Sequence, residues 1–92
     1  MYLITDMELS QLRIFVAVAE TGSFTKAAKK LYVSHSTTSR GVSSLEAELG
    51  TSLFERDNRI FALTEAGELL YPRAKEILRL AEETEEEMRA IL

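Results

Sequence analysis

The stretch SHSTTSRGVSSLEAELG, residues 34–50, has the composition of an ordinary helix only in its second half. Short hydroxyl side chains dominate its first half. Ser34 is a good N-cap, and Gly50 is a residue type that often ends a helix, so the stretch predicts a helix over 35–49. Its inward-facing stripe is expected to consist of Thr38, Val42, Leu45 and Leu49.

The outer face of this helix is polar. A rotation of about 100° per residue places Ser36, Arg40 and Ser43 opposite the inner stripe, with Ser39 at the edge and His35 near the helix start. Short hydroxyls allow a helix backbone to approach phosphates and base edges closely. An Arg can donate two hydrogen bonds to guanine or hold a phosphate. The alternative is a Ser/Thr-rich helix face that is simply solvated.

A shorter helix is expected before it, capped by Ser23 or Thr25 and followed by a brief turn at residues 32–34. Two helices joined by such a turn form a helix-turn-helix, in which the second helix enters the major groove of DNA. A first amphipathic helix, with capping-box spacing at Thr5 and Glu8, is expected to start near Asp6. Its apolar stripe includes Leu9, and Gly22 should end it.

Two short segments rich in β-forming residues, 53–57 and 59–64, follow the 35–49 helix. Asp57 and Asn58 separate them and suit a tight turn. The pattern predicts a two-stranded hairpin that packs on the helices through Leu53, Phe54 and Leu63, because an isolated hairpin is marginally stable.

A last helix is expected from Thr64 to the end of the sequence, about 40 Å long. Its apolar residues alternate steps of four and three, which is typical of a coiled-coil seam. The surface that remains in 92 residues is too small to cover such a seam, so we expect self-association through it. Pro72 should kink or weaken the first turns. The expected dimerisation residues are Leu70, Ala74, Ile77, Ala81, Thr84, Met88 and Ile91.

Composition excludes several classes of protein. The chain has no Cys and one His, so no disulfide framework, thiolate zinc site or multi-histidine metal site is expected, and no cofactor. No apolar run approaches the roughly 18 residues that span a bilayer, and no signal peptide is evident, so the cytoplasm is the expected compartment. The net charge is −4, yet residues 23–59 hold six basic side chains against four acidic ones. The distribution of charge is therefore compatible with nucleic acid.

The ordered motifs FVAVAE, GSFTKAA, LYVS, SR, LEAELG, LFER and LTEAG, over roughly 7–81, resemble the N-terminal domain of LysR-type transcriptional regulators. The resemblance implies a mainly α fold: a winged helix-turn-helix with a two-stranded β wing over 1–64 and a long linker and dimerisation helix over 65–92. It implies sequence-specific binding to double-stranded DNA as a homodimer whose linker helices pack antiparallel. The candidate DNA-binding residues are Thr25, Ser34, His35, Ser36, Ser39, Arg40, Ser43, Arg56 and Arg59.

The chain also departs from the family pattern. His35 stands where Gln is usual, Thr38 where an aliphatic residue is usual, Gly41 where Gln is common and Ser43 where Arg or Lys is common. The family's larger effector-binding domain has no counterpart in these residues. A small-molecule effector is therefore expected only if a further C-terminal domain exists, and the chain is expected to be an isolated or truncated DNA-binding module.

Two other function classes compete with DNA binding. An enzyme is disfavoured because the sequence has no Gly-rich phosphate loop, no nucleophile–base spacing and no metal cluster. A protein-interaction module, in which the last helix pairs with a different chain, is the more serious alternative.

Overall fold

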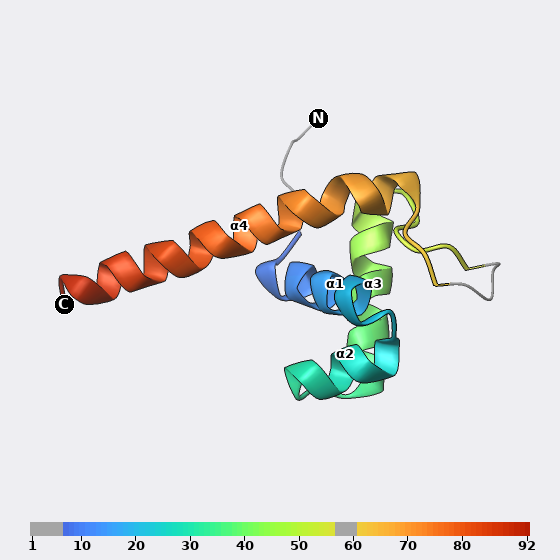
Figure 1. Cartoon of the computed structure of the whole chain (residues 1–92), viewed down its shortest axis with the longest axis horizontal. Helices are drawn as coiled ribbons and strands as arrows, with labels where there is room; N and C mark the ends of the chain where they lie inside the picture. The colour runs from blue at the N-terminus through green and yellow to red at the C-terminus, as the bar shows by residue number, and fades with distance from the viewer. Residues whose placement is uncertain (1–6, 57–60) are drawn as a thin grey trace.

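The computed structural model describes residues 7–56 and 61–92, and in this part of the chain it contains four helices. They are α1 (Leu9–Thr21), α2 (Phe24–Leu31), α3 (His35–Leu49) and α4 (Glu65–Ala90). The first three form a compact unit in which α1 contacts α2, α3 and α4 (Figure 1). The long α4 crosses this unit and projects well beyond it, and residues 50–56 and 61–64 lie at the end of the molecule where α4 begins (Figure 1).

Side-chain caps start three of the helices, as their sequences predict. The hydroxyl of Ser23 accepts a hydrogen bond from the backbone N–H of Lys26 at 3.1 Å, so Ser23 and not Thr25 caps α2. Ser34 caps α3 and Thr64 caps α4 in the same way, each at 3.0 Å. The predicted bounds of α3, 35–49, are confirmed.

The start of α1 differs from the prediction. The helix begins at Leu9 instead of near Asp6, and its capping box joins Glu8 to Gln11, whose side-chain oxygen accepts from the Glu8 N–H at 2.8 Å. Thr5 lies outside the described residues. Leu9, expected in the buried stripe, is 42% exposed, because a residue in the first turn lies beyond the end of the core.

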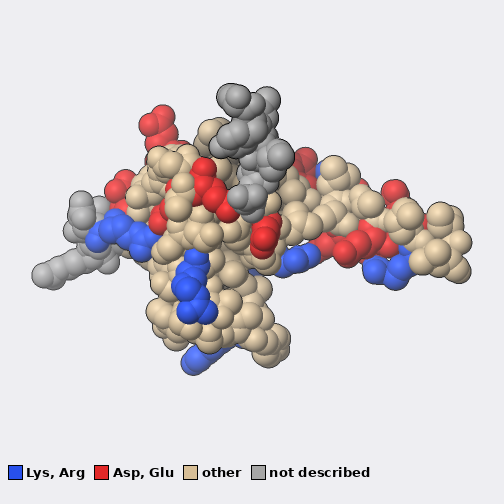
Figure 2. All heavy atoms as spheres, turned by 180° about the vertical axis from the view of Figure 1, so that it is seen from behind, with Lys and Arg blue, Asp and Glu red and all other residues tan. Residues whose placement is uncertain are grey.

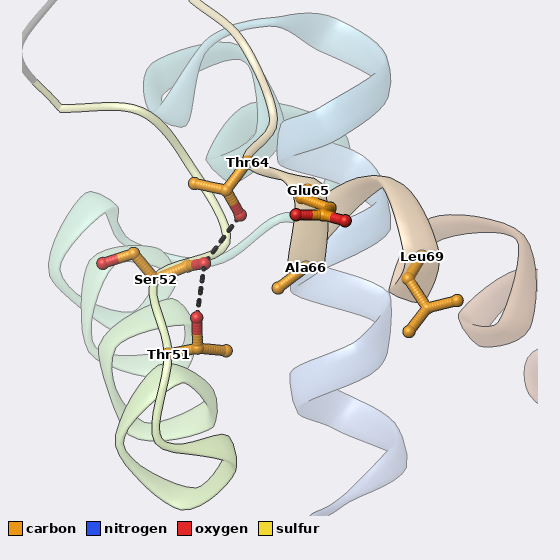
Figure 3. Close-up of a pocket in the computed structure, with 6 residues that line it drawn as sticks. All are labelled: Thr51, Ser52, Thr64, Glu65, Ala66 and Leu69. Atoms are coloured by element: carbon orange, nitrogen blue, oxygen red, sulfur yellow. Dashed lines mark hydrogen bonds between the residues drawn. The ribbon is translucent and has the colours of Figure 1, made fainter.

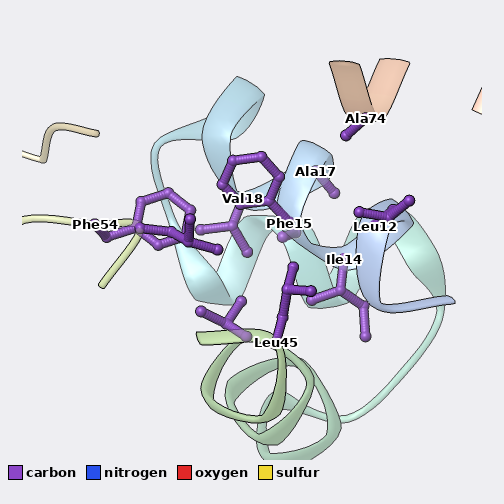
Figure 4. Close-up of a cluster of buried hydrophobic side chains, with 11 residues drawn as sticks. Leu12, Ile14, Phe15, Ala17, Val18, Leu45, Phe54 and Ala74 are labelled. Atoms are coloured by element: carbon purple, nitrogen blue, oxygen red, sulfur yellow. The ribbon is translucent and has the colours of Figure 1, made fainter. Parts of the chain in front are cut away.

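The core gathers around α1, between α3, α4 and the segment after α3. The side chains of Leu12, Phe15 and Val18 on α1 meet Leu45 of α3 and Phe54 (Figure 4). The rings of Phe15 and Phe54 lie 5.5 Å apart between centroids. Ala74 of α4 is fully buried against α1 in the same cluster (Figure 4). The first half of α4 is therefore part of the core.

The inner face of α3 explains two unusual residues. Thr38 is fully buried, and its hydroxyl donates to the Ser34 carbonyl at 3.1 Å, which satisfies the polar atom inside the core. A Cβ at Gly41 would lie 2.6 Å from Cδ1 of Ile14, so the Gly allows α3 to approach α1 closely. Val42 and Leu45 are buried as predicted. Leu49 is 41% exposed, so its predicted inward position is wrong: the last turn of α3 extends past the core.

The predicted hairpin is present only as a short antiparallel pairing. Phe54 and Leu63 form one isolated β-bridge, and the described residues contain no longer strand. The Glu55 N–H donates to the Ala62 carbonyl at 2.9 Å, which extends the pairing slightly. The predicted turn at Asp57 and Asn58 lies outside the described residues. Leu53 and Phe54 are each 1% exposed, which confirms that this segment packs on the helices.

Pro72, expected to kink or weaken the first turns, does not interrupt α4. Pro72 lies in the second turn, where α4 also packs against α1, and this tertiary packing holds the helix together despite the missing N–H donor. Beyond Leu78, α4 leaves the compact unit and runs free to its C-terminus (Figure 1). No helix of the described residues is both long enough and apolar enough to cross a membrane.

Candidate nucleic-acid interface

The polar face of α3 faces solvent. His35, Ser36, Arg40 and Ser43 are exposed and Ser39 is half-buried, while Thr38 on the opposite face is fully buried. The angular prediction from the sequence is thereby confirmed for these side chains. The side chain of Arg40 has no ion-pair partner among the described residues, so its guanidinium donors are available to an incoming group.

The start of α3 is organised by hydroxyl groups. Besides capping the helix, Ser34 donates to Thr37 Oγ1 at 2.9 Å, and its Oγ lies 3.1 Å from the hydroxyl oxygen of Ser36. His35 packs beside Phe24 of α2, with ring centroids 6.3 Å apart. These contacts fix the helix N-terminus, where unsatisfied backbone N–H groups and the helix dipole favour an anion.

α2 and the part of α3 that precedes Glu46 contain no acidic residue. No Asp or Glu occurs between Glu20 and Glu46, whereas Lys26, Lys29, Lys30 and Arg40 lie in this interval, and so does His35. Seen from behind, the lobe below α4 shows basic and neutral side chains, and the acidic ones lie higher and along α4 (Figure 2). The net negative charge of the chain is therefore carried away from the polar face of α3.

The α2 residues contribute unequally to this surface. Thr25 is exposed near the start of α2 and, because Ser23 is the cap, its hydroxyl is not needed for capping. Lys26 and Lys29 are also exposed. Lys30 lies 3.4 Å from a carboxylate oxygen of Glu20, so part of its charge is already compensated.

Arg56 lies where the 50–64 connection leaves the core. Its Nη2 donates to Glu46 Oε1 at 2.9 Å, and its guanidinium carbon lies 5.9 Å from the centre of the Phe24 ring. Phe61, 38% exposed, packs on the rings of Phe24 and Phe54. Arg56 is thus half-exposed but held beside α2 and α3. Arg59 lies outside the described residues.

The exposed apolar side chains of α4 coincide with the predicted seam only in part. Ala74 is buried in the core of its own chain, and Leu70 packs against that core. Neither side chain is therefore fully free to contact a second copy. Ile91 follows the last helical residue. Ile77, Thr84 and Met88 are exposed as predicted, and Ala81 is half-buried. The sequence analysis missed Leu69 and Leu80, which are 66% and 59% exposed.

These residues define one apolar stripe on α4. At 100° per residue, Leu69, Ile77, Leu80, Thr84 and Met88 lie within an arc of about 100°, and the centre of this arc is about 90° from Ala74, which meets α1. The predicted seam shares Ile77, Thr84 and Met88 with this stripe but also includes the buried Ala74, because spacing alone does not separate a buried apolar face from an unpaired one. We call this set the α4 stripe.

A shallow hollow lies where the loop after α3 meets the start of α4. Thr51, Ser52, Thr64, Glu65, Ala66 and Leu69 line it (Figure 3). Its polar groups bond to one another: Thr64 Oγ1 donates to the Ser52 carbonyl at 2.7 Å, which ties the loop to α4 (Figure 3). Within residues 7–56 and 61–92, no cluster of three or more His, Cys, Asp or Glu side chains suits a metal ion.

The order α2, short turn, α3, with a solvated polar face on α3, defines a helix-turn-helix protein. A family model described as bacterial regulatory helix-turn-helix protein, lysR family, matches residues 9–68. The chain belongs to this family of regulatory proteins.

Individual relatives agree with the family match. An uncharacterised HTH-type transcriptional regulator of Azotobacter vinelandii is 45% identical over 78 residues, which are 85% of this chain and 54% of that protein. The structure of a BenM DNA-binding domain with catB site 1 DNA has a TM-score of 0.87 at 41% identity and covers 92% of this chain and 96% of that one. A CbnR DNA-binding domain–DNA complex has a TM-score of 0.84 at 44% identity, with 92% and 98% coverage.

Many relatives are longer than the present chain. It spans 54% of the length of the Azotobacter vinelandii regulator and 24% of that of a probable RuBisCO transcriptional regulator of Porphyra purpurea. These relatives are named as transcriptional regulators.

Proposed function

We propose that this chain binds double-stranded DNA in a sequence-specific manner and acts as the DNA-binding part of a transcriptional regulator. The observation that carries the proposal is the two-sidedness of α3. One face is buried in the core, and the other presents Ser36, Arg40 and Ser43 to solvent within a stretch that has no acidic residue. The solved DNA complexes of two related DNA-binding domains support the same function.

In this proposal α3 lies in the major groove, with its first turns nearest the base edges. Arg40 reads a base, and His35, Ser36, Ser39 and Ser43 contact base edges or adjacent phosphates. Ser34 and Thr25 contact the phosphate backbone from the start of α3 and of α2. The segment around the Phe54–Leu63 bridge forms a two-stranded wing, from which Arg56 and Arg59 reach the backbone or the minor groove.

Residues 1–64 form the DNA-binding part and 65–92 a helix that joins two copies. The α4 stripe supports a homodimer, since four of its five side chains are large, apolar and unpaired in one copy. Two-fold symmetry would present two α3 helices to two half-sites. We expect a small-molecule effector only for a longer protein that includes a further domain.

The experiment that tests this function is selection from a random duplex library, followed by binding measurements on the selected site and on a scrambled site. We expect Arg40→Ala to weaken binding to the selected site by about 1–3 kcal/mol and to relax the base preference at one position. Arg40→Lys keeps the charge but not the two-pronged geometry, so it should lose most of the specificity as well.

Two outcomes would contradict the proposal. Equal loss on selected and scrambled duplexes would make Arg40 a phosphate contact. Failure of the chain to bind any duplex in low salt would refute DNA binding itself.

A further inference from the structure

Glu46 is the acidic side chain that borders the proposed DNA-binding surface. It lies on α3, six residues after Arg40, and is the first acidic residue after Glu20. Its side chain is 15% exposed, which is low for a carboxylate, and both of its oxygens are engaged. Glu46 is therefore held in a fixed position by the fold.

The two oxygens of Glu46 have different partners. Oε2 accepts a hydrogen bond from the backbone N–H of Leu53 at 2.7 Å, and Leu53 is buried in the core. Oε1 accepts from Nη2 of Arg56 at 2.9 Å. The first bond ties α3 to the segment that leads into the proposed wing, and the second places a guanidinium at the base of that segment.

The ion pair has a consequence for any anion that approaches Arg56. The Arg56 side chain is 50% exposed and one edge of it faces Glu46, so a phosphate must compete with a carboxylate that is already in contact. When Arg56 neutralises a phosphate, a counterion leaves the DNA, but Glu46 loses part of its compensation and attracts a cation in turn. The net release of ions at this position is then close to zero.

We propose that Glu46 is a positioning residue that holds Arg56 in place and limits its contribution to DNA affinity. This inference rests on the proposed function. Glu46 and the Phe24 ring hold the Arg56 side chain in place. The same carboxylate weakens the attraction of Arg56 to the phosphates of DNA, whatever the base sequence. The contribution of α3 to base recognition is thereby larger relative to the sequence-independent attraction of the wing.

The test is Glu46→Gln, because Gln keeps an oxygen that can accept from the Leu53 N–H and presents an uncharged NH2 group to Arg56, which removes both the charge and the acceptor of the ion pair. The probe is a 30-base-pair duplex of mixed sequence, and the apparent Kd is measured by fluorescence anisotropy over a range of NaCl concentrations. Binding should tighten about two- to fivefold at low salt, as expected for release from a half-exposed ion pair. The slope of log K against log salt concentration should become steeper by up to about 0.9, which corresponds to one further phosphate neutralised by the protein.

Two controls separate the ion pair from charge alone. Glu48→Gln removes the same charge from the same helix at an exposed residue that has no ion pair among the described residues, and should change affinity less. In an Arg56→Ala background, Glu46→Gln should no longer steepen the salt dependence. Thermal unfolding of each variant shows that the fold is retained.

Three results would overturn the inference. They are an unchanged Kd and salt slope in Glu46→Gln, an equal gain in Glu48→Gln, or a gain that persists without Arg56. All three results require that the wild-type chain bind the duplex, so they are distinct from failure of the proposed function. If the proposed function fails, the wild-type chain shows no binding at low salt, and the inference about Glu46 is then overturned as well.

Discussion

At the scale of single residues, Tyr32 stands out because it has a backbone conformation that costs energy. Tyr32 ends α2 with a φ of 58°, in the left-handed region. Among the described residues, Tyr32 is the only non-Gly residue with a positive φ. Its ring is 95% exposed and contributes almost no packing. Left-handed backbone is unfavourable by about 1–2 kcal/mol for most side chains and less so for Asn.

We therefore expect Tyr32→Asn to raise the free energy of unfolding by about 0.5–1 kcal/mol. Chemical denaturation followed by circular dichroism measures the change. Tyr32→Ala is the matched control, because it removes the same ring but keeps a Cβ that is unfavourable in this conformation, and should give little gain. An equal gain in both variants would show that the ring, and not the backbone, is responsible.

Sequence alone predicts the residue-level features that are local. Ser34 and Thr64 cap α3 and α4, and Gly22 and Gly50 end α1 and α3 in the left-handed conformation. These roles can be predicted because each depends on neighbours within four residues. The polar residues of the α3 face are predicted for the same reason. Leu49 is misplaced because its burial depends on where the core ends, which is a tertiary property.

At the scale of helices, Glu20 joins three elements. Its carboxylate on α1 accepts from the Tyr71 hydroxyl of α4 at 2.9 Å and lies 3.4 Å and 3.6 Å from the ammonium groups of Lys30 on α2 and Lys75 on α4. The Tyr71 hydrogen bond, and then the two lysines, hold the pKa of Glu20 below its ordinary value of 4.5. This cluster helps to fix the direction in which α4 leaves the core.

The lowered pKa of Glu20 makes its contribution to stability depend on pH. The contribution is fully present above the unfolded-state pKa near 4.5 and is lost as the pH falls through the lower folded-state pKa. Tyr71→Phe should reduce the free energy of unfolding by about 0.5–1 kcal/mol at pH 7. This reduction is small for the loss of a hydrogen bond to a charged group, because the Tyr71–Glu20 pair is exposed. The difference from wild type should shrink below about pH 4.

Denaturation at a series of pH values tests this prediction, with Tyr32→Phe as the control for loss of an exposed hydroxyl. A deficit in Tyr71→Phe that stays constant from pH 7 to pH 3 would mean that the charge of Glu20 is not involved.

Between elements, the sequence predicts less. It predicts the existence and order of the helices, because their apolar periodicity and caps are strong. Of the two predicted strands, the described residues show one bridge, at Phe54 and Leu63, with the rings of Phe54 and Phe61 packed beside it. The spacing on α4 could not separate Ala74, which meets α1, from Leu80, which meets solvent.

At the scale of the whole molecule, the proposed function involves a second copy of the chain. The α4 stripe runs from Leu69 into the free half of α4, and burying it would remove several large apolar side chains from water. Acidic residues on the outer sides of the same helix keep the rest of it solvated.

Ile77→Asp combined with Leu80→Asp should convert a dimer to a monomer in sedimentation equilibrium, because two carboxylates cannot be buried unpaired in an apolar interface. Tyr32→Asp adds a carboxylate at an exposed residue at the end of α2, away from α4, and should leave the mass unchanged. An unaltered mass in the double variant would exclude the α4 stripe as the surface that joins two copies and would favour a different partner chain.

The central claim is that the exposed face of α3 contacts DNA directly. Titration of the ¹⁵N-labelled chain with its selected duplex, followed residue by residue through the backbone amide resonances, tests it most directly. We predict the largest changes over residues 34–43 on α3, with smaller ones at the start of α2 and near Arg56. Largest changes on α1 or on the C-terminal half of α4, with residues 34–43 unaffected, would contradict the account.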